Sequence, residues 1–479
     1  MRILISIPCW GRDYSRLFSE YSLATQLSAC NIPALARRHS ITYHILTTRR
    51  DAGWLRQRPS IKALEQHATV VFQLMEDMGY DPEYIPDGIT GEKYQFMSVV
   101  QNEAIQKSLD YDALVFNYAD FIWSDGSLSH AIALLASDVD AVLSFCLPVD
   151  RRAALPALDR ARQDTNGSGV LTLTSSDASV VAIDHLHPEA RRRFWHSPTF
   201  TMTPTYLIWP VADVGLLVRA YHQTVLALRV RPDNPKYRAG IPYGSLDGYF
   251  TAILAEDGVI RHATDSADGI VFSLYDSTVD SSLTKGVTRE ASIRACLEKT
   301  VSLGQREYAR AAIRVRRTGT GPGLWDHVEQ TSWDVLEKLH GQATFDPAVF
   351  ESMYADDHSR ADFEQKWRGP IYKNAPVKWL FRATLAIARS AAGPSIKVIL
   401  GEHRARRVYR RLEAFAFATE PRRPSLAARA SRFRARAAES VLRGATRVAR
   451  SNAGQVLKAA LGVNRARALY RSLESLLQK

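Results

Sequence analysis

The sequence predicts an α/β protein built on a mostly parallel, doubly wound sheet, with a helical extension at its C-terminal side. Short apolar segments alternate with helix-like segments over the first 150 residues, which is the pattern of a parallel sheet. The composition, 46% hydrophobic and 23% charged, is that of a folded globular protein. A length of 479 residues exceeds one ordinary core and indicates a large domain with additions.

The individual elements follow from apolar runs, hydrophobic spacing and breaker residues. We expect strands at 2–7, 41–47, 69–74, 113–116, 141–145 and 203–210, and helices at 15–28, 59–67, 94–109, 127–135 and 214–220. Polar loops follow the first, second and fourth of these strands, at 8–13, 48–51 and 117–125. Ligands of doubly wound sheets bind beyond the carboxyl ends of the strands, so these loops are the candidate site.

The chain divides into three predicted parts. Residues 1–287 form the main α/β domain, 288–400 a helical extension, and 401–479 a basic tail. The tail carries 19 Lys and Arg against 5 Asp and Glu, whereas the whole chain has a net charge of +12. Apolar residues recur in it at helical spacing among arginines, which favours binding to an anionic membrane surface. A helical docking arm and a solvated helix are the alternatives.

The remaining composition excludes several classes of protein. The near-neutral body argues against a nucleic-acid partner. Four scattered cysteines indicate neither a disulfide framework nor a zinc site. No apolar run has the roughly 20 residues that span a bilayer, and no export signal is recognisable. We therefore expect a cytoplasmic protein, held by its tail at the inner face of the plasma membrane. Glycine-rich dinucleotide, P-loop, zincin and serine-hydrolase motifs are absent from the sequence.

The segment after the predicted strand 113–116 contains the main candidates for metal binding. Asp120 follows this buried strand, and Asp125 lies five residues further on. Mg²⁺ and Mn²⁺ prefer oxygen ligands and usually take one or two carboxylates plus substrate phosphates. The pattern predicts Asp120 as a ligand of Mn²⁺ or Mg²⁺, with Asp125 as a second ligand. A strand-end aspartate and a helix N-cap are the alternative roles.

At this point the sequence resembles the GT-A glycosyltransferases, and bacterial ones most of all. Pro8 after an apolar first strand, Lys93 and Asn102 before the third motif, and Tyr118-Ala-Asp120 follow the order of that family over roughly residues 1–280. The resemblance implies a GT-A fold and transfer of a sugar from a nucleotide diphosphate donor to a cell-surface glycan or a lipid-linked precursor. It implies that the metal binds the donor diphosphate. The chain departs from the family where Tyr118 replaces the usual first acidic residue.

The resemblance also assigns roles to residues. It implies donor contacts for Pro8, and the polar loops supply further candidates for this role: Arg12, Asp13, Thr48, Asp51 and Tyr118. Lys93, just before the predicted helix 94–109, is a candidate for neutralising a phosphate, with a solvated surface lysine as its alternative role. His262 is a candidate third metal ligand, because the family often takes a late ligand from a histidine; a surface histidine at a strand end is its alternative role. Asp247, followed by Gly248, matches the acidic residue that deprotonates the acceptor hydroxyl in inverting members of the family; a helix N-cap is its alternative role. Trp195, Tyr206 and Trp209 are expected to pack in the core or to line an acceptor pocket.

Two other functions stay open at the level of the sequence. A nucleotidyltransferase on a similar sheet would need a glycine-rich basic loop after the first strand, and Pro-Cys-Trp-Gly-Arg at 8–12 is a poor version of one. A non-catalytic sugar- or nucleotide-binding scaffold at the membrane is the second alternative, because Tyr118 occupies the first acidic position.

Overall fold

The computed structural model describes residues 1–80, 91–135, 138–162, 169–201, 204–240, 246, 250–252, 254, 258–276, 288–317 and 322–350. All of them belong to one compact unit, Met1–Gly369. The predicted tail 401–479 and the second half of the predicted extension lie outside the described residues. The boundary at residue 287 and the membrane-binding tail therefore stay predictions.

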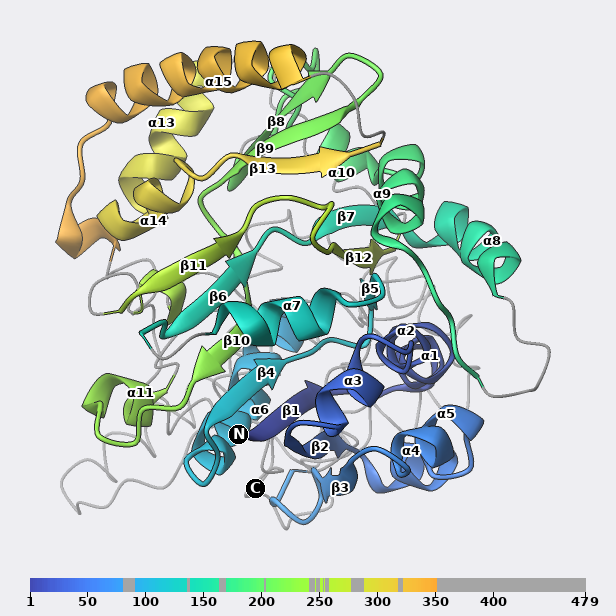
Figure 1. Cartoon of the computed structure of the whole chain (residues 1–479). Helices are drawn as coiled ribbons and strands as arrows, with labels where there is room; N and C mark the ends of the chain where they lie inside the picture. Colours follow the sequence, from blue (N-terminus) through green and yellow to red (C-terminus); the bar gives the residue numbers. More distant parts are fainter. Residues whose placement is uncertain are drawn as a thin grey trace, which may run out of the picture. The chain divides into compact units, whose positions relative to one another are not determined.

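A seven-stranded sheet forms the centre of the fold (Figure 1). Its strand order is β11-β6-β10-β4-β1-β2-β3. β1 runs parallel to β2 and β4, β2 to β3, and β6 to β11, whereas β10 is antiparallel to both of its neighbours. The mostly parallel sheet expected from the sequence is thereby confirmed. The strands are β1 (Arg2–Pro8), β2 (Ser40–Thr47), β3 (Thr69–Leu74), β4 (Ala113–Phe116), β6 (Ala141–Ser144), β10 (Thr224–Arg229) and β11 (Ile260–Ala263).

Helices cover both faces of this sheet because side chains alternate along each strand. In β1, Ile3, Ile5 and Ile7 point into one core, and Leu4 points into the other. The first face packs against α1 (Arg12–Leu17), the π-helix η1 (Phe18–Ser22), α2 (Leu23–Gln26), α3 (Ile32–Ala36), α4 (Arg49–Leu55), α5 (Pro59–Leu64) and α7 (Ser127–Leu134). The second face packs against α6 (Gly91–Ser108) and α11 (Pro235–Ala239).

Two three-stranded sheets extend the central one. The first has the order β5-β12-β7, formed by β5 (Phe121–Trp123), β12 (Val271–Tyr275) and β7 (Leu147–Asp150). The second has the order β13-β9-β8, formed by β13 (Ile313–Arg316), β9 (Gly215–Ala220) and β8 (Tyr206–Val211). Around them lie α8 (Arg151–Ala161), α9 (Ser175–Asp184), α10 (Pro188–Arg191), α13 (Arg289–Lys299), α14 (Leu303–Tyr308) and α15 (Pro322–Gln342).

The helix predicted at 214–220 is wrong, because this segment forms β9. Its residues pair antiparallel with β8 on one side and with β13 on the other. Gly215 shows how closely the strands approach: a Cβ built on it would lie 2.2 Å from the carbonyl oxygen of Val315. All six residues of β9 are buried, which fits a strand covered on both faces. A short, mainly apolar run of this kind does not distinguish a strand from a helix by its periodicity.

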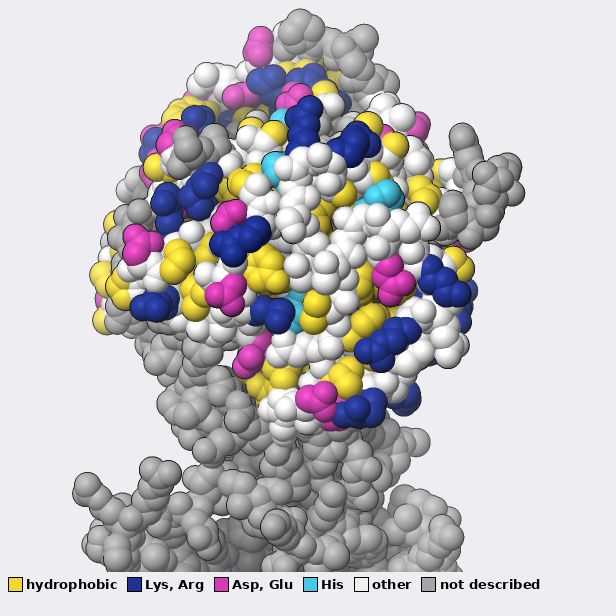
Figure 2. All heavy atoms as spheres, turned by 60° about the horizontal axis from the view of Figure 1, so that its bottom comes forward, with side chains coloured by type: hydrophobic (Ala, Val, Ile, Leu, Met, Phe, Trp, Pro, Cys, Tyr) yellow, Lys and Arg dark blue, Asp and Glu magenta, His cyan; other side chains and the backbone are white. Residues whose placement is uncertain are grey.

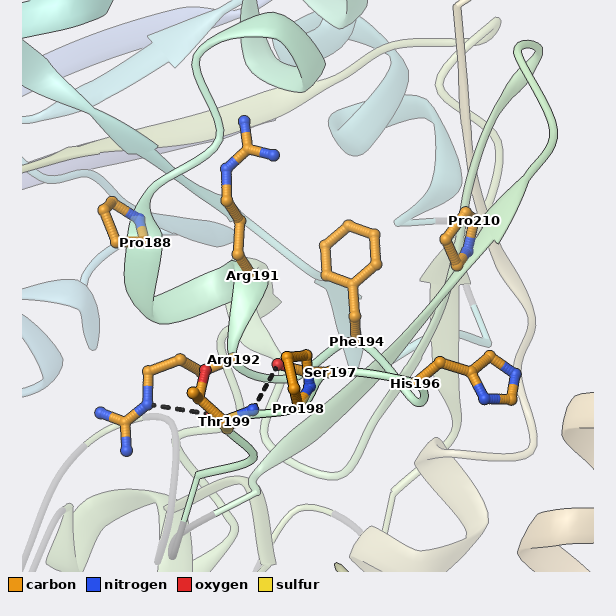
Figure 3. A pocket seen from close by; sticks show the side chains of 9 residues that line it. All are labelled: Pro188, Arg191, Arg192, Phe194, His196, Ser197, Pro198, Thr199 and Pro210. Atoms are coloured by element: carbon orange, nitrogen blue, oxygen red, sulfur yellow. Dashed lines mark hydrogen bonds between the residues drawn. The ribbon is translucent and has the colours of Figure 1, made fainter. Parts of the chain in front are cut away.

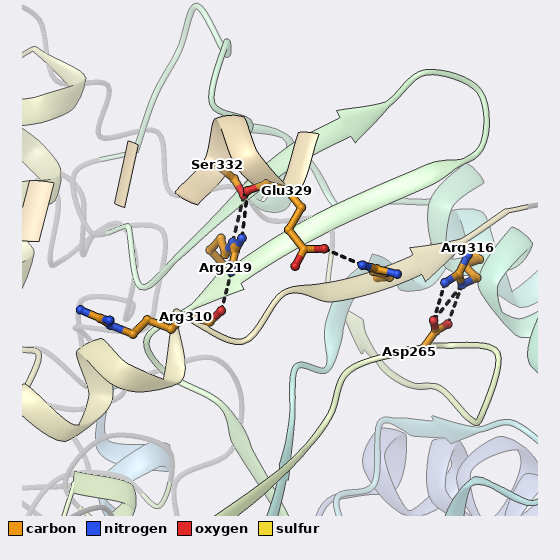
Figure 4. A network of polar contacts seen from close by, with 7 residues as sticks. Arg219, Asp265, Arg310, Arg316, Glu329 and Ser332 are labelled. Carbon is orange, nitrogen blue, oxygen red and sulfur yellow. Dashed lines mark hydrogen bonds and ion pairs between the residues drawn. The ribbon is translucent and has the colours of Figure 1, made fainter. Parts of the chain in front are cut away.

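Two arginines fasten α15 to the small sheet β13-β9-β8, one from β9 and one from β13 (Figure 4). Arg219, only 1% exposed, donates from Nε to Ser332 Oγ at 3.0 Å and from Nη2 to the carbonyl oxygen of Glu329 at 3.1 Å. Its pKa is lowered by burial. Arg314 on β13 pairs with the Glu329 carboxylate at 2.6 Å. The predicted extension thus contributes a strand as well as helices, and its described part packs directly on the β8–β9 hairpin.

The described surface mixes both signs of charge. Figure 2 shows lysine and arginine side chains interspersed with acidic and apolar ones on the face that it presents. Among the described residues, no helix combines the length and the apolar character needed to cross a membrane.

Candidate functional site

Three polar loops meet at the carboxyl edge of β2, β1 and β4. In the register of the sheet, Pro8 at the end of β1 lies beside Leu46 of β2, and Ser6 lies beside Phe116 at the end of β4. The loops that follow these three strands therefore start from the same edge, as the sequence predicts. Pro8 itself is a buried residue of β1.

Asp51 ties the first loop to the second. Its carboxylate is 2% exposed, and Oδ2 accepts hydrogen bonds from the Gly11 amide at 2.9 Å and from Thr48 Oγ1 at 2.8 Å. Thr48 is the N-cap of α4 and accepts in turn from the Asp51 amide at 3.2 Å. Gly11 has φ 81° and ψ 145°, a backbone region that essentially only glycine occupies. Asp51 and Thr48 thus shape the edge and do not project from it.

Arg12 places a cation at the same edge. Its guanidinium carbon lies 4.0 Å from the centre of the Trp54 ring, and that of Arg58 lies 4.2 Å from the same ring. Stacking on an aromatic ring holds an arginine in place while leaving its N–H groups able to donate. Asp13, the next residue, is exposed in the first turn of α1. Of the two candidates in this loop, Arg12 has the chemistry to face a phosphate.

The turn after β4 is held from three sides. Ser22 of η1 donates from Oγ to the carbonyl oxygen of Tyr118 at 3.1 Å, and Gln101 of α6 donates from Nε2 to the Tyr118 hydroxyl at 2.9 Å. Asn117 is buried and donates from Nδ2 to the Tyr43 hydroxyl at 2.9 Å. Tyr118 therefore supports the turn through its ring and hydroxyl. Its position matches the first acidic residue of the GT-A motif, but its contacts here are with protein groups.

Asp120 ends this turn at the start of β5. Its Oδ2 accepts from Ser273 Oγ of β12 at 2.9 Å, and its carbonyl oxygen accepts from the Leu274 amide at 2.9 Å. The residue is half-buried. The Ser273 hydroxyl therefore helps to orient the carboxylate of a half-buried aspartate at the edge of the sheet.

The other two predicted metal ligands lie elsewhere. Asp125 follows β5, which separates it from Asp120 by about 10 Å or more; its Oδ1 accepts from the Cys30 amide at 2.8 Å. His262 lies on β11, three strands and thus about 14 Å from β4. Its Nδ1 is 2.8 Å from Gln223 Oε1, and burial lowers its pKa to about 4. The structure does not bring these residues to Asp120.

The described residues at the edge fit a divalent cation that takes one ligand from the protein and the others from a substrate. Among the described residues, no cluster of three or more His, Cys, Asp or Glu side chains could hold a metal. Asp120 provides one hard oxygen ligand, and Mg²⁺ sites commonly combine a single carboxylate with substrate phosphates and water. Asp120 therefore fits as the protein ligand of a cation that arrives with a diphosphate.

The described part of the chain does not test two of the predicted site residues, Asp247 and Lys93. Asp247 lies outside the described residues. Lys93 falls in the first turn of α6, but its side chain is outside the described part of the chain. The donor role of Lys93 and the base role of Asp247 stay predictions.

The structure adds two residues that the sequence did not single out. Ser273 and Ser22 both hold the Asn117–Asp120 turn. Ser273 is a single serine in an apolar strand and Ser22 ends a short helix of mixed composition, so no local pattern marks either residue. Trp195, Tyr206 and Trp209 pack in the core around β8, where Trp195 and Trp209 stack with ring centres 5.8 Å apart.

Comparison with known proteins identifies no family. No family model and no curated protein sequence matches the chain. Solved structures with local similarity include mouse xyloside xylosyltransferase 1, at 10% identity and a TM-score of 0.22 over 35% of this chain and 61% of the mouse protein. A mannosyltransferase from Pyrobaculum calidifontis, solved with GDP-Man and Mn²⁺, aligns at 13% identity and a TM-score of 0.26 over 83% of each chain. A putative glucose-1-phosphate thymidylyltransferase from Bacillus anthracis aligns at 14% identity and a TM-score of 0.20, over 32% of this chain and 57% of the Bacillus protein. The chain spans less than two thirds of the mouse and Bacillus proteins, and similarity at this level assigns no substrate.

Proposed function

We propose that this protein is a glycosyltransferase of the GT-A type, which moves a sugar from a nucleotide diphosphate donor to a cell-surface glycan or its lipid-linked precursor. The observation that carries the proposal is the meeting of three polar loops at the carboxyl edge of β2, β1 and β4, with Asp120 oriented there by Ser273. A doubly wound sheet binds its ligand at such an edge.

Each loop has a role in this proposal. The loop from Pro8 to Asp13 and the N-terminal turn of α4 hold the nucleotide, with Arg12 facing a phosphate. The two hydrogen bonds that Asp51 Oδ2 accepts from Gly11 and Thr48, which we call the Asp51 clasp, keep the two loops together. Asp120 would hold Mn²⁺ or Mg²⁺, which when bound offsets the charge of the diphosphate.

The transfer itself exchanges one bond at the anomeric carbon. The acceptor hydroxyl oxygen bonds to that carbon, the bond from the carbon to the diphosphate oxygen breaks, and the nucleoside diphosphate leaves with the electron pair. The hydroxyl proton passes to a carboxylate on the acceptor side. We assign that proton to Asp247, on the strength of the sequence resemblance alone.

The direct test is a screen of nucleotide sugars for Mn²⁺-dependent turnover by the full chain. Asp120→Ala is expected to abolish turnover, because the diphosphate loses the protein ligand of its cation. Asp125→Ala is the matched control: it removes another hydrogen-bonded aspartate, at the far end of β5, and turnover should persist. Circular dichroism shows whether both variants are folded. Full activity of a folded Asp120→Ala variant would end the assignment.

The screen also separates the proposal from a scaffold whose sugar site has decayed. Calorimetry with UDP- and GDP-sugars should show binding that strengthens with Mn²⁺. If Mn²⁺ strengthens the binding of no nucleotide, the scaffold is favoured.

We further propose that the tail at 401–479 holds the enzyme at the inner face of the plasma membrane, where lipid-linked acceptors occur. Support comes from its 19 basic against 5 acidic residues. Each basic residue near an anionic surface contributes about 1 kcal/mol. The full chain should sediment with phosphatidylserine vesicles and be released by about 0.5 M salt, because salt screens charge. Equal sedimentation with neutral phosphatidylcholine vesicles would contradict the electrostatic attachment.

A further inference from the structure

A cavity of about 560 Å³ lies away from the carboxyl edge, between α10, the following loop and β8 (Figure 3). Small-molecule sites usually have volumes of about 300–1,000 Å³. The residues around this cavity are Pro188, Arg191, Arg192, Phe194, Pro210 and the segment 196–199. None of the residues discussed for the donor site lines it.

The wall of the cavity is fixed by the protein itself. Arg192, 9% exposed, donates from Nε to the carbonyl oxygen of Thr199 at 3.3 Å. Arg289 of α13 donates from Nη2 to the carbonyl oxygen of Ser197 at 3.3 Å. The Trp195 amide donates to Ile208 of β8 at 2.8 Å. A ligand would therefore enter a pocket that needs little ordering, which favours binding.

The open side of the cavity offers a cation beside flat apolar groups. Arg191 is exposed, and only its Nε has a hydrogen bond in the described part of the chain, to the carbonyl oxygen of Leu186 at 3.3 Å. The carboxylate of Glu189, two residues before Arg191, is engaged by Arg192 and Arg193. In Figure 3, Arg191 and the Phe194 ring extend side by side between Pro188 and Pro210.

We propose that this cavity binds an anionic sugar, with its carboxylate or phosphate on Arg191 and its ring against Phe194. A guanidinium binds either oxyanion through two parallel hydrogen bonds. The flat face of a sugar ring covers an aromatic ring and proline edges well. The choice of a saccharide rests on the proposed transferase activity, for which the cavity would hold an acidic part of the acceptor glycan.

The test is calorimetry on the full chain with five probes: a glucuronic acid disaccharide, glucose 1-phosphate, the neutral disaccharide cellobiose, inorganic phosphate, and a tetraglutamate peptide. At least one charged sugar should bind about tenfold or more tightly than cellobiose and phosphate. Which charged sugar binds better distinguishes a uronate from a phosphate. Arg191→Gln and Phe194→Ala should each weaken that binding about fivefold or more. Arg38→Gln, which removes an exposed arginine after α3, is the control and should bind as the parent does.

Several results would overturn the inference. They are equal binding of charged and neutral sugars, phosphate alone binding as tightly as the sugar phosphate, a tetraglutamate peptide binding more tightly than either sugar, or unchanged binding by a folded Arg191→Gln variant. Asp120→Ala should bind the charged sugar normally, because Asp120 does not line the cavity. Sugar binding without any donor turnover would therefore refute the transferase while keeping the site.

Discussion

The Asp51 clasp allows a quantitative prediction about the edge of the sheet. Asp51→Ala removes the acceptor of two hydrogen bonds, from the Gly11 amide at 2.9 Å and from Thr48 Oγ1 at 2.8 Å. A hydrogen bond to a charged group contributes about 1.5–3 kcal/mol net, and a buried amide without a partner costs a similar amount. Gly11 and Asp51 are buried, and water replaces the carboxylate only in part. We therefore expect Asp51→Ala to lower the free energy of unfolding by about 3–5 kcal/mol.

Asp51→Asn refines the same prediction. Its amide oxygen can take the place of Oδ2 and accept both hydrogen bonds, but without the negative charge. Charge-assisted hydrogen bonds are roughly twice as strong as neutral ones, so the expected loss is about 1–2 kcal/mol. The stability order should be parent, Asp51→Asn and then Asp51→Ala.

Two measurements on the full chain check this reasoning. Thermal unfolding followed by tryptophan fluorescence should show a midpoint lowered by about 6–20 °C in Asp51→Ala, since 1 kcal/mol corresponds to roughly 2–4 °C in domains of 150–250 residues. Hydrogen exchange of the Gly11 amide should accelerate. Asp13→Ala, which changes an exposed aspartate in the adjoining helix, should alter neither. A midpoint for Asp51→Ala within 1 °C of the parent, with Gly11 still protected, would refute the clasp.

Three further predictions concern the pH dependence of stability, the candidate site and the sheet β13-β9-β8. Burial lowers the pKa of His44 to about 4, so the folded protein rejects a proton that the unfolded chain binds near pH 6.5. The free energy of unfolding should therefore fall by up to about 1.4 kcal/mol per pH unit as the pH drops from about 6.5 to about 4. When the urea midpoint is plotted against pH, His44→Gln should show a shallower slope than the parent. Parallel plots for the two proteins would contradict this. Ser273→Ala should lower kcat/KM about tenfold and raise the Mn²⁺ concentration needed for the half-maximal rate, because Asp120 loses an orienting hydroxyl. Ser273→Thr keeps a hydroxyl and should restore both values. An unchanged Mn²⁺ requirement in Ser273→Ala would argue against this role. Gly215→Ala should destabilise by about 2 kcal/mol or more, because the new methyl group meets a backbone carbonyl at 2.2 Å, whereas Gly53→Ala in open space on α4 should stabilise by about 0.5–1 kcal/mol; equal melting midpoints would contradict the contrast.

The positions of the parallel strands could be anticipated from the chain alone. The strands expected at 2–7, 41–47, 69–74 and 113–116 all form, because short apolar runs bounded by breakers have a local cause. The polar loops after β1, β2 and β4 meet at one edge because parallel strands carry their carboxyl ends to the same side. These are properties that local sequence and chain direction together determine.

Tertiary structure alone decided which polar residues share a site. Asp120 and Asp125 look like one motif in sequence, but a strand lies between them, and β11 places His262 three strands from β4. Ser273 is 153 residues from Asp120, and its serine carries no local signal of the contact. The segment 214–220 became a strand only because β8 and β13 flank it. Periodicity records which side of an element is buried, whereas contacts between distant segments depend on how the sheets pack, and no local pattern contains that information.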